Sequence, residues 1–274
     1  MTNNTTPELT DPLATLVSTS IAAGALILKI RENLDGWEEK ADGSPVTMAD
    51  RGAEDLIVST LAKLDPTTPV MAEERISSGE TTPAASQRFY LVDALDGTRE
   101  FIKKRDEFTV NIALIEAGEP VMGVVVAPAL GEGFAADASG AFRFRVVAGA
   151  ATRIEAITAR APSSSITILS SLSHMTLETE DYLQQFDVSE RLSYGSSLKF
   201  CRLAEGIADL YPRLSRTMEW DIAAGDAILR RAGGSVRTLD GAPMRYGKVI
   251  NPDDVAFANP HFVAFGNWPA ERLP

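Results

Sequence analysis

The sequence lacks the features that mark secreted and membrane proteins. It has a single cysteine, Cys201, so no intrachain disulfide can form, which fits a reducing compartment. The longest apolar run, Ile21 to Leu28, is interrupted by Gly24 and is far too short to span a bilayer. Residues 1–12 are polar and carry no positive cluster, so we expect no secretory signal there. These absences predict a cytoplasmic protein without an integral membrane segment.

Basic residues are scarce relative to acidic ones. The chain has 26 Lys and Arg against 38 Asp and Glu, a net charge of -12. Such a surface repels nucleic acid polymers and anionic membranes, so we expect neither as a partner. A small anionic ligand is still allowed if cations or local basic residues neutralise it. The 274 residues are 45% hydrophobic and 23% charged, which is typical of an ordinary globular protein with one large domain or two medium ones.

Hydrophobic patterning divides the chain into two halves. After a flexible leader, residues 1–12, residues 13–160 are expected to form an α+β half, with Asp11 as the cap of a first helix over 13–34 and a second helix over 48–64. Residues 75–87 are rich in Ser, Thr, Gly and Pro and are expected to form an exposed loop. Helices alternate with short strands in residues 161–274, which predicts an α/β half. Pro and Ser cluster at the boundary, near residues 159–165.

Three acidic groups stand at the ends of predicted strands or helices, where rigid elements give way to loops. They are Glu73-Glu74, the pair Asp93 and Asp96, and Asp221. Hard cations such as Mg²⁺ prefer oxygen ligands in near-octahedral geometry. Asp93 and Asp96, three residues apart around a tight turn, can therefore face one pair of cations.

The residues around this turn fit the same chemistry. The Leu95 carbonyl is expected to point toward the cations, Gly97 permits a positive φ, and Thr98 supplies a hydroxyl that could orient a water. Each acidic group also has an ordinary structural explanation when taken alone. Asp93 or Asp96 could form an Asx turn, and Glu73-Glu74 could be a solvated strand end. Asp221 could simply cap the helix that follows.

Taken together, the motifs resemble the inositol monophosphatase superfamily of Mg²⁺-dependent, lithium-sensitive phosphatases, over nearly the whole chain. In that family four motifs recur in this order, here as Pro45 to Asp50, Glu73-Glu74, Asp93 to Thr98, and Trp220 to Ala224. The resemblance implies a layered αβαβα sandwich with the metal site between its two halves, most of the metal ligands coming from the first half. A homodimer, common in the superfamily, is also implied.

Further stretches resemble the CysQ-type 3'(2'),5'-bisphosphate nucleotidases within that superfamily. They are Lys40 to Pro45, Thr98 to Lys103, Glu107 to Leu114, Gly195 to Cys201, and Ala208 to Arg213. Such enzymes remove one phosphate from 3'-phosphoadenosine 5'-phosphate, a by-product of sulfate assimilation. The implied substrate is therefore a small phosphorylated nucleotide.

The resemblance also implies roles for individual residues. Two or three Mg²⁺ would be bound by Glu73, Asp93, Asp96, Asp221 and the Leu95 carbonyl. The catalytic residues would be Asp50, Thr98 and Glu73, with Asp50 and Thr98 holding and activating the attacking water. The substrate would contact Lys40, Gly97, Thr98, His174, Ser196, Lys199, Arg213 and Asp221.

Some of these residues have a second interpretation from the sequence. His174 could be an exposed loop histidine, Lys199 a solvated helix residue, and Arg213 a surface ion-pair partner. Leu172 stands where the bacterial nucleotidases usually carry Arg, and losing that guanidinium removes a possible phosphate contact. Two alternatives to a nucleotide phosphatase stay open. The substrate could be an inositol, histidinol or other sugar phosphate, or the protein could be a catalytically inactive metal-binding relative.

Overall fold

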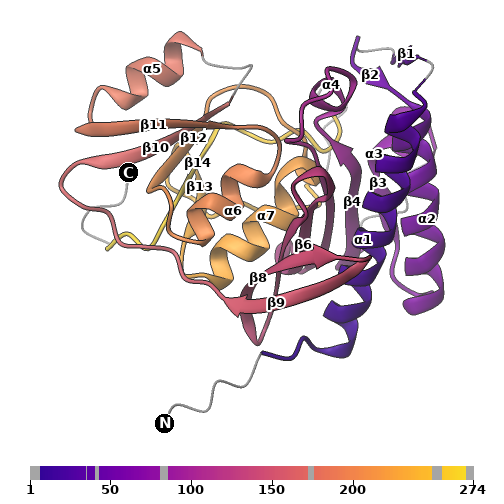
Figure 1. Cartoon of the computed structure of the whole chain (residues 1–274). Coiled ribbons are helices and arrows are strands. Elements are labelled where there is room, and N and C mark those ends of the chain that lie inside the picture. The colour runs from indigo at the N-terminus through magenta and orange to yellow at the C-terminus, as the bar shows by residue number, and fades with distance from the viewer. Residues whose placement is uncertain are drawn as a thin grey trace.

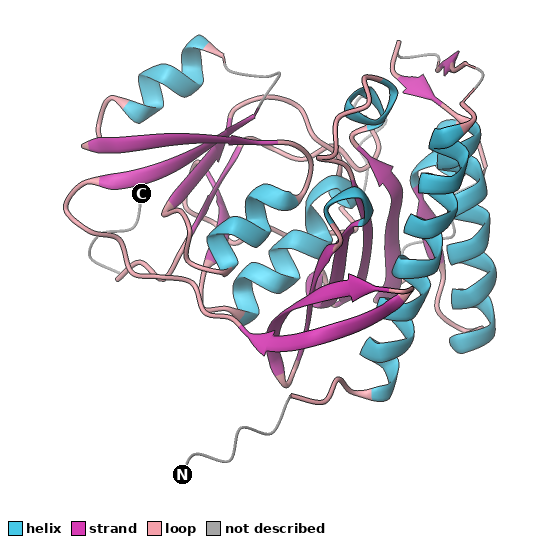
Figure 2. Ribbon diagram, in the orientation of Figure 1, coloured by secondary structure: helices cyan, strands magenta, loops and turns pink. Residues whose placement is uncertain are grey.

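The computed structural model describes residues 7–34, 36–40, 43–80, 86–171, 176–248 and 255–269. Its main elements form five layers, two sheets alternating with three layers of helices (Figures 1 and 2). This is the predicted αβαβα sandwich. The two sheets are built from the two predicted halves of the chain, while the division into separate domains stays a prediction.

A seven-stranded sheet forms the second layer. Its strands follow chain order: β3 (Val70–Ala72), β4 (Arg88–Asp96), β5 (Thr109–Glu116), β6 (Glu119–Ala127), β7 (Glu132–Asp137), β8 (Gly140–Val147) and β9 (Ala150–Ala156). In this sheet β3 and β4 are parallel, and each later strand runs antiparallel to the one before it. Helices α1 (Asp11–Glu32) and α2 (Met48–Leu64) cover one face of the sheet, with a fully buried apolar cluster beneath them (Figure 1).

Helices α6 (Leu198–Ala204) and α7 (Glu219–Arg231) form the central layer between the two sheets (Figure 1). Helix α7 packs on β5 and β6 although it belongs to the second half of the chain. A glycine permits this close approach: a Cβ on Gly123 would lie 2.5 Å from the Ala224 carbonyl oxygen. The packing fixes the N-terminus of α7 against the end of the first sheet where β4 stops.

The fourth and fifth layers complete the fold. The second sheet has the order β11-β10-β12-β14-β13 and is mixed, with β10 parallel to both of its neighbours. Its strands are β10 (Ile166–Ser171), β11 (Val188–Tyr194), β12 (Leu210–Arg213), β13 (Ser235–Thr238) and β14 (Phe262–Phe265). Helix α5 (Leu177–Leu183) covers its outer face (Figure 2). The remaining short elements are β1 (Glu38–Glu39), β2 (Pro45–Val46), α3 (Glu73–Ser77), α4 (Thr98–Ile102) and a 3₁₀ turn (Pro128–Leu130).

Helix α1 is long and apolar enough to cross a membrane by length and composition alone. The sequence prediction considered only an uninterrupted apolar run and therefore missed this property. In the structure 50% of the apolar window is buried inside the protein, and the helix packs along α2, β5 and β6. This packing is that of a core helix.

The structure corrects three local predictions. Thr10, not Asp11, is the N-cap of α1, and Asp11 lies in the first turn. The predicted loop over 75–87 starts too early, because Arg75–Ser77 complete helix α3. Asp93 and Asp96 both lie in strand β4, where a register shift, not a tight turn, separates them.

Candidate active site

The irregularity in β4 brings Asp93 and Asp96 to one side of the sheet. Asp93 pairs with Asn111 and Asp96 pairs with Thr109, so two residues of β4 oppose one residue of β5. In a regular strand, residues three apart point to opposite faces. The extra residue of a β-bulge changes this relation, so both carboxylates can serve the same site.

Gly97 lies between strand β4 and helix α4, in the left-handed backbone conformation. Gly97 has φ 95° and ψ 38°, the positive φ that the sequence predicted. A Cβ there would lie 2.4 Å from the Ser196 Oγ, so the position also needs a residue without a side chain. The turn places Thr98 at the start of α4, directly beside the N-terminus of α2.

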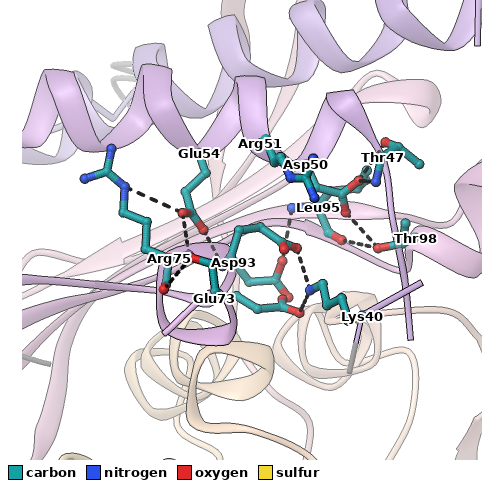
Figure 3. A network of polar contacts seen from close by, with 12 residues as sticks. Lys40, Thr47, Asp50, Arg51, Glu54, Glu73, Arg75, Asp93, Leu95 and Thr98 are labelled. Carbon is teal, nitrogen blue, oxygen red and sulfur yellow. Dashed lines mark hydrogen bonds and ion pairs between the residues drawn. The ribbon is translucent and has the colours of Figure 1, made fainter. Parts of the chain in front are cut away.

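Asp50 and Thr98 are hydrogen-bonded to each other (Figure 3). The Thr98 hydroxyl lies 2.9 Å from Asp50 Oδ1, while Asp50 Oδ2 accepts hydrogen bonds from the Thr47 backbone N–H and hydroxyl. Asp50 thereby completes the capping box of α2. Burial raises the pKa of Asp50, and the hydrogen bonds from Thr47 and Thr98 oppose that rise.

Glu73 and Glu74 begin helix α3 and are held by an acidic residue of α2. Glu54, buried against α3, accepts hydrogen bonds from the backbone N–H groups of Glu74 at 2.7 Å and Arg75 at 3.0 Å (Figure 3). Burial raises the pKa of Glu54 to about 7 and that of Glu74 to about 7. Glu54 was not predicted as a site residue. It lies four residues after Asp50, and this pair of acids in the core-facing stripe of a helix is the signal that could have identified it.

Lys40 forms ion pairs with the two glutamates of α3, a contact that the sequence did not predict. Its ammonium lies 2.7 Å from Glu73 Oε1 and 2.6 Å from Glu74 Oε1 (Figure 3). Burial lowers the pKa of Lys40, but the two carboxylates outweigh it and raise the pKa above its ordinary value. Lys40 therefore neutralises part of the acidic cluster, and its role in substrate binding stays a prediction.

Asp221 reaches the site from the central layer. Its Oδ2 accepts a hydrogen bond from the Met218 backbone N–H at 2.8 Å, so it does cap α7, which was the alternative interpretation of this residue. It also faces the first sheet: ligand oxygens of Glu73, Asp93 and Asp221 all lie within 4.8 Å of one another. Capping and participation in the acidic cluster are thus compatible.

The cluster concentrates negative charge in a buried place. Burial raises the pKa of Asp93 and of Asp221 well above their ordinary values, and repulsion from neighbouring carboxylates raises them further. Burial also raises the pKa of Asp96, to about 6, against the influence of Lys199. Burying several carboxylates together is unfavourable unless a cation neutralises them, and their oxygens are a donor set that fits Mg²⁺ or a similar hard cation. The residues present therefore fit the predicted metal site, while the identity and number of ions stay predictions.

Ser197 connects the two sides of the cluster and was not predicted. Its hydroxyl lies 2.6 Å from the Asp221 carbonyl oxygen and 3.1 Å from Asp96 Oδ2, and it accepts a hydrogen bond from the Asn111 side chain at 2.8 Å. Ser196 next to it has φ 50° and directs its hydroxyl to the backbone carbonyls of Asp96 and Glu107. Ser196 thus joins the two halves through the main chain.

A cavity of about 340 Å³ opens beside the carboxylates. The predicted residues that line it are Glu73, Asp96, Gly97, Thr98, Ser196, Lys199, Arg213 and Asp221. Four further predicted residues are not part of this lining but lie close to it. Asp50 and the Leu95 carbonyl accept hydrogen bonds from the Thr98 hydroxyl, and Lys40 and Asp93 lie beside Glu73. His174 and Leu172 lie outside the described residues.

Lys199 and Arg213 form a basic wall of this cavity. Lys199 is buried, and its ammonium donates to the Ser196 and Tyr194 carbonyl oxygens at 2.7 and 3.2 Å. It also lies 5.3 Å from the centre of the Tyr211 ring. Burial lowers the pKa of Lys199 to about 8, while Asp96 opposes that change. Lys199 is therefore not the solvated helix residue of the alternative interpretation.

Comparisons with known proteins agree with this geometry. Residues 9–265 match the model of the inositol monophosphatase family. The 3'(2'),5'-bisphosphate nucleotidase CysQ of Escherichia coli K12 is 41% identical, over 88% of this chain and 94% of that protein. The CysQ protein of Salmonella typhimurium is 43% identical with the same coverage.

Solved structures give the same result. The crystal structure of CysQ from Bacteroides thetaiotaomicron, a bacterial member of the inositol monophosphatase family, has a TM-score of 0.77 and 36% identity to this chain. It covers 93% of this chain and 97% of its own. An IMPase of Thermotoga maritima has a TM-score of 0.73 at 26% identity, covering 94% of this chain and 92% of its own. The predicted resemblance is confirmed: the chain belongs to the inositol monophosphatase family.

Proposed function

We propose that this protein is a Mg²⁺-dependent phosphatase that hydrolyses the 3'-phosphate of 3'-phosphoadenosine 5'-phosphate to give AMP and phosphate. The observation that carries this proposal is the distribution of charge in one cavity. Carboxylates of Glu73, Asp96 and Asp221 line it together with the cations of Lys199 and Arg213. A substrate with two phosphates matches this arrangement, because each phosphate would meet positive charge. The relatives named as 3'(2'),5'-bisphosphate nucleotidases support the same substrate.

The carboxylates of the cluster would bind the metal ions that take part in hydrolysis. Glu73, Asp93, Asp96 and Asp221, with the Leu95 carbonyl, would hold two or three Mg²⁺. When bound, Mg²⁺ supplies the positive charge that acidifies water and stabilises a departing ester oxygen. Ser197 and Asn111 keep Asp96 in place, and Glu54 keeps the start of α3 in place.

Asp50 and Thr98 would position the attacking water. The Thr98 hydroxyl donates its hydrogen to Asp50 Oδ1 at 2.9 Å, so the lone pairs of Thr98 Oγ are free to accept a hydrogen from water. A water held this way is oriented toward the phosphorus and can release its proton toward the Thr98–Asp50 pair. Positioning of this kind and electrostatic stabilisation account for most of the rate in phosphoryl transfer.

Lys199 and Arg213 would hold the phosphate that does not react. The Lys199 ammonium is fixed by two backbone carbonyls, and an Arg213 N–H group donates to the Arg216 carbonyl oxygen at 3.3 Å. Both cations are therefore oriented before the substrate arrives, which lowers the entropy cost of binding. We further propose a cytoplasmic homodimer that acts on a by-product of sulfate assimilation.

The test is phosphate release from purified protein with Mg²⁺ and with EDTA. The panel holds 3'-phosphoadenosine 5'-phosphate, inositol 1-phosphate, histidinol phosphate and fructose 1,6-bisphosphate. We expect a clear preference for the nucleotide that is lost in EDTA. Preference for a sugar or inositol phosphate would leave the metal site intact and reject the roles of Lys199 and Arg213. No release from any substrate, with Mg²⁺ still bound, would indicate an inactive relative.

A further inference from the structure

Two arginines of the cavity take no part in the proposed hydrolysis. Arg99 comes from the first turn of α4, and Arg216 comes from the loop between β12 and α7. Both are exposed and line the cavity together with Lys199 and Arg213. Two separate segments of the chain thus bring guanidinium groups to one opening.

These arginines differ from most arginines of this acidic protein. Most described arginines form an ion pair with a carboxylate, as Arg51 does with Glu38 and Arg230 does with Asp226. Among the residues that the structure describes, neither Arg99 nor Arg216 forms one. At a net charge of -12, cations without carboxylate partners at one opening are not explained by the stability of the fold.

Arg213, next to these two, has an unsatisfied donor. Its Nε is buried and has no hydrogen-bond partner, and one of its terminal N–H groups reaches the Arg216 carbonyl oxygen. A buried donor without an acceptor costs free energy, so an acceptor from a ligand would be favourable there. The same contact ties the backbone of Arg216 to the wall that Arg213 forms.

Outside the metal cluster, the lining of the cavity can accommodate an anion. Glu73, Asp96 and Asp221 belong to the metal cluster, and Glu100, which follows Arg99, is the remaining acidic residue of the lining. Arg99, Lys199, Arg213 and Arg216 together exceed the single charge of Glu100. Outside the metal cluster, the lining of the cavity therefore carries net positive charge.

We infer that Arg99 and Arg216 bind the non-reacting phosphate at the mouth of the cavity and so select substrates that carry a second phosphate. The inference rests on the proposed function, because it takes the carboxylate cluster as the place where the reacting phosphate binds. Guanidinium groups suit this task, since each presents several N–H donors in a planar fork that matches phosphate oxygens. Because the contact exists in both the ground state and the transition state, it lowers KM and leaves kcat unchanged.

The experiment compares two substrates with the same reacting group. 3'-Phosphoadenosine 5'-phosphate and 3'-AMP share the 3'-phosphate and the adenosine, and only the first has a 5'-phosphate. The variants are Arg99→Gln, Arg216→Gln and the double substitution. Arg231→Gln is the control, because Arg231 is exposed in the last turn of α7, at the opposite end of the helix from Asp221. It removes the same charge away from the cavity.

We expect each single substitution to lower kcat/KM for the bisphosphate about tenfold and the double substitution about a hundredfold, as for charge-assisted hydrogen bonds. The loss should lie in KM. Activity of the variants on 3'-AMP should stay within about twofold of the wild type, because 3'-AMP has no 5'-phosphate for Arg99 and Arg216 to contact. The control should match the wild type on both substrates, because Arg231 contacts neither of them.

Equal losses on the two substrates would overturn the inference, because they would indicate a structural or catalytic role. Unchanged kinetics in the double variant would overturn it as well. If the wild type prefers the bisphosphate and the variants keep that preference, only the inference fails. If the wild type hydrolyses inositol 1-phosphate but neither nucleotide, the proposed function fails and the inference falls with it.

Discussion

The acidic cluster makes the stability of the metal-free protein depend on pH in a direction opposite to that of most carboxylates. The pKa of Asp96 is about 6 in the folded protein, against an ordinary value of 3.8. A carboxyl group with a raised pKa binds its proton more tightly in the folded state. Its contribution is therefore complete below pH 3.8 and is lost as pH rises through 6.

The size of this effect follows from the two pKa values. At 1.36 kcal/mol per pKa unit, the difference between 3.8 and about 6 amounts to about 3 kcal/mol of unfolding free energy. About half of this stabilisation is already lost at about pH 5, because the unfolded chain has released its proton there. The other half is lost between about pH 5 and about pH 7.5. Glu54 and Glu74, each with a pKa of about 7, act in the same direction.

The measurement is urea unfolding in EDTA at these two pH values, for the wild type and Asp96→Asn. The asparagine cannot ionise, so the difference in unfolding free energy between variant and wild type should grow by about 1.5 kcal/mol from the lower to the higher pH. Asp181→Asn, an exposed position on α5, is the matched control and should show no such change. Parallel pH profiles for the wild type and Asp96→Asn would refute the reasoning. Added Mg²⁺ should stabilise the wild type more at the higher pH, where its ligands are ionised.

Three further predictions concern activity. Asp93→Asn should reduce Mg²⁺-dependent phosphate release to background while circular dichroism stays native, and near-normal turnover would reject Asp93 as a metal ligand. Glu54→Gln should raise the Mg²⁺ concentration for half-maximal activity about tenfold, because the amide holds the α3 N–H groups more weakly; an unchanged titration would show that Glu54 does not position Glu73. Lys199 has a pKa of about 8, so KM for the bisphosphate should rise above that pH as its charge is lost, and Lys199→Met should remove this dependence. A pH-independent KM in the wild type would contradict the last prediction.

The sequence predicted the elements whose signals are local. Helix α2 has both predicted ends, Met48 and Leu64, because an apolar stripe and a following proline mark it in the sequence. The convergence of Asp93 and Asp221 could be expected from motif order through the family resemblance. The five-residue helices α3 and α4 were not predicted, because they are too short to show a helical period.

Other features depend on partners that a single segment does not reveal. The bulge between Asp93 and Asp96 is defined by the register with β5, so the pair was interpreted as a turn. The Ser197 bridge and the grouping of Arg99 with Arg216 arise only when the second half of the chain packs on the first. Tertiary packing, not local propensity, determines these parts of the site.

The hydroxyl of Ser197 has a consequence for biosynthesis. It joins Asp96 to the Asp221 backbone, and the first of these contacts spans 101 residues of sequence. During synthesis the strands of the first sheet leave the ribosome well before α6 and α7, so a nascent chain carries Asp93 and Asp96 without the residues that complete the cavity. Hydrolysis can begin only after the late helices dock, and contacts of such long range form slowly. The time at which phosphatase activity appears therefore reports when the last step of folding is complete.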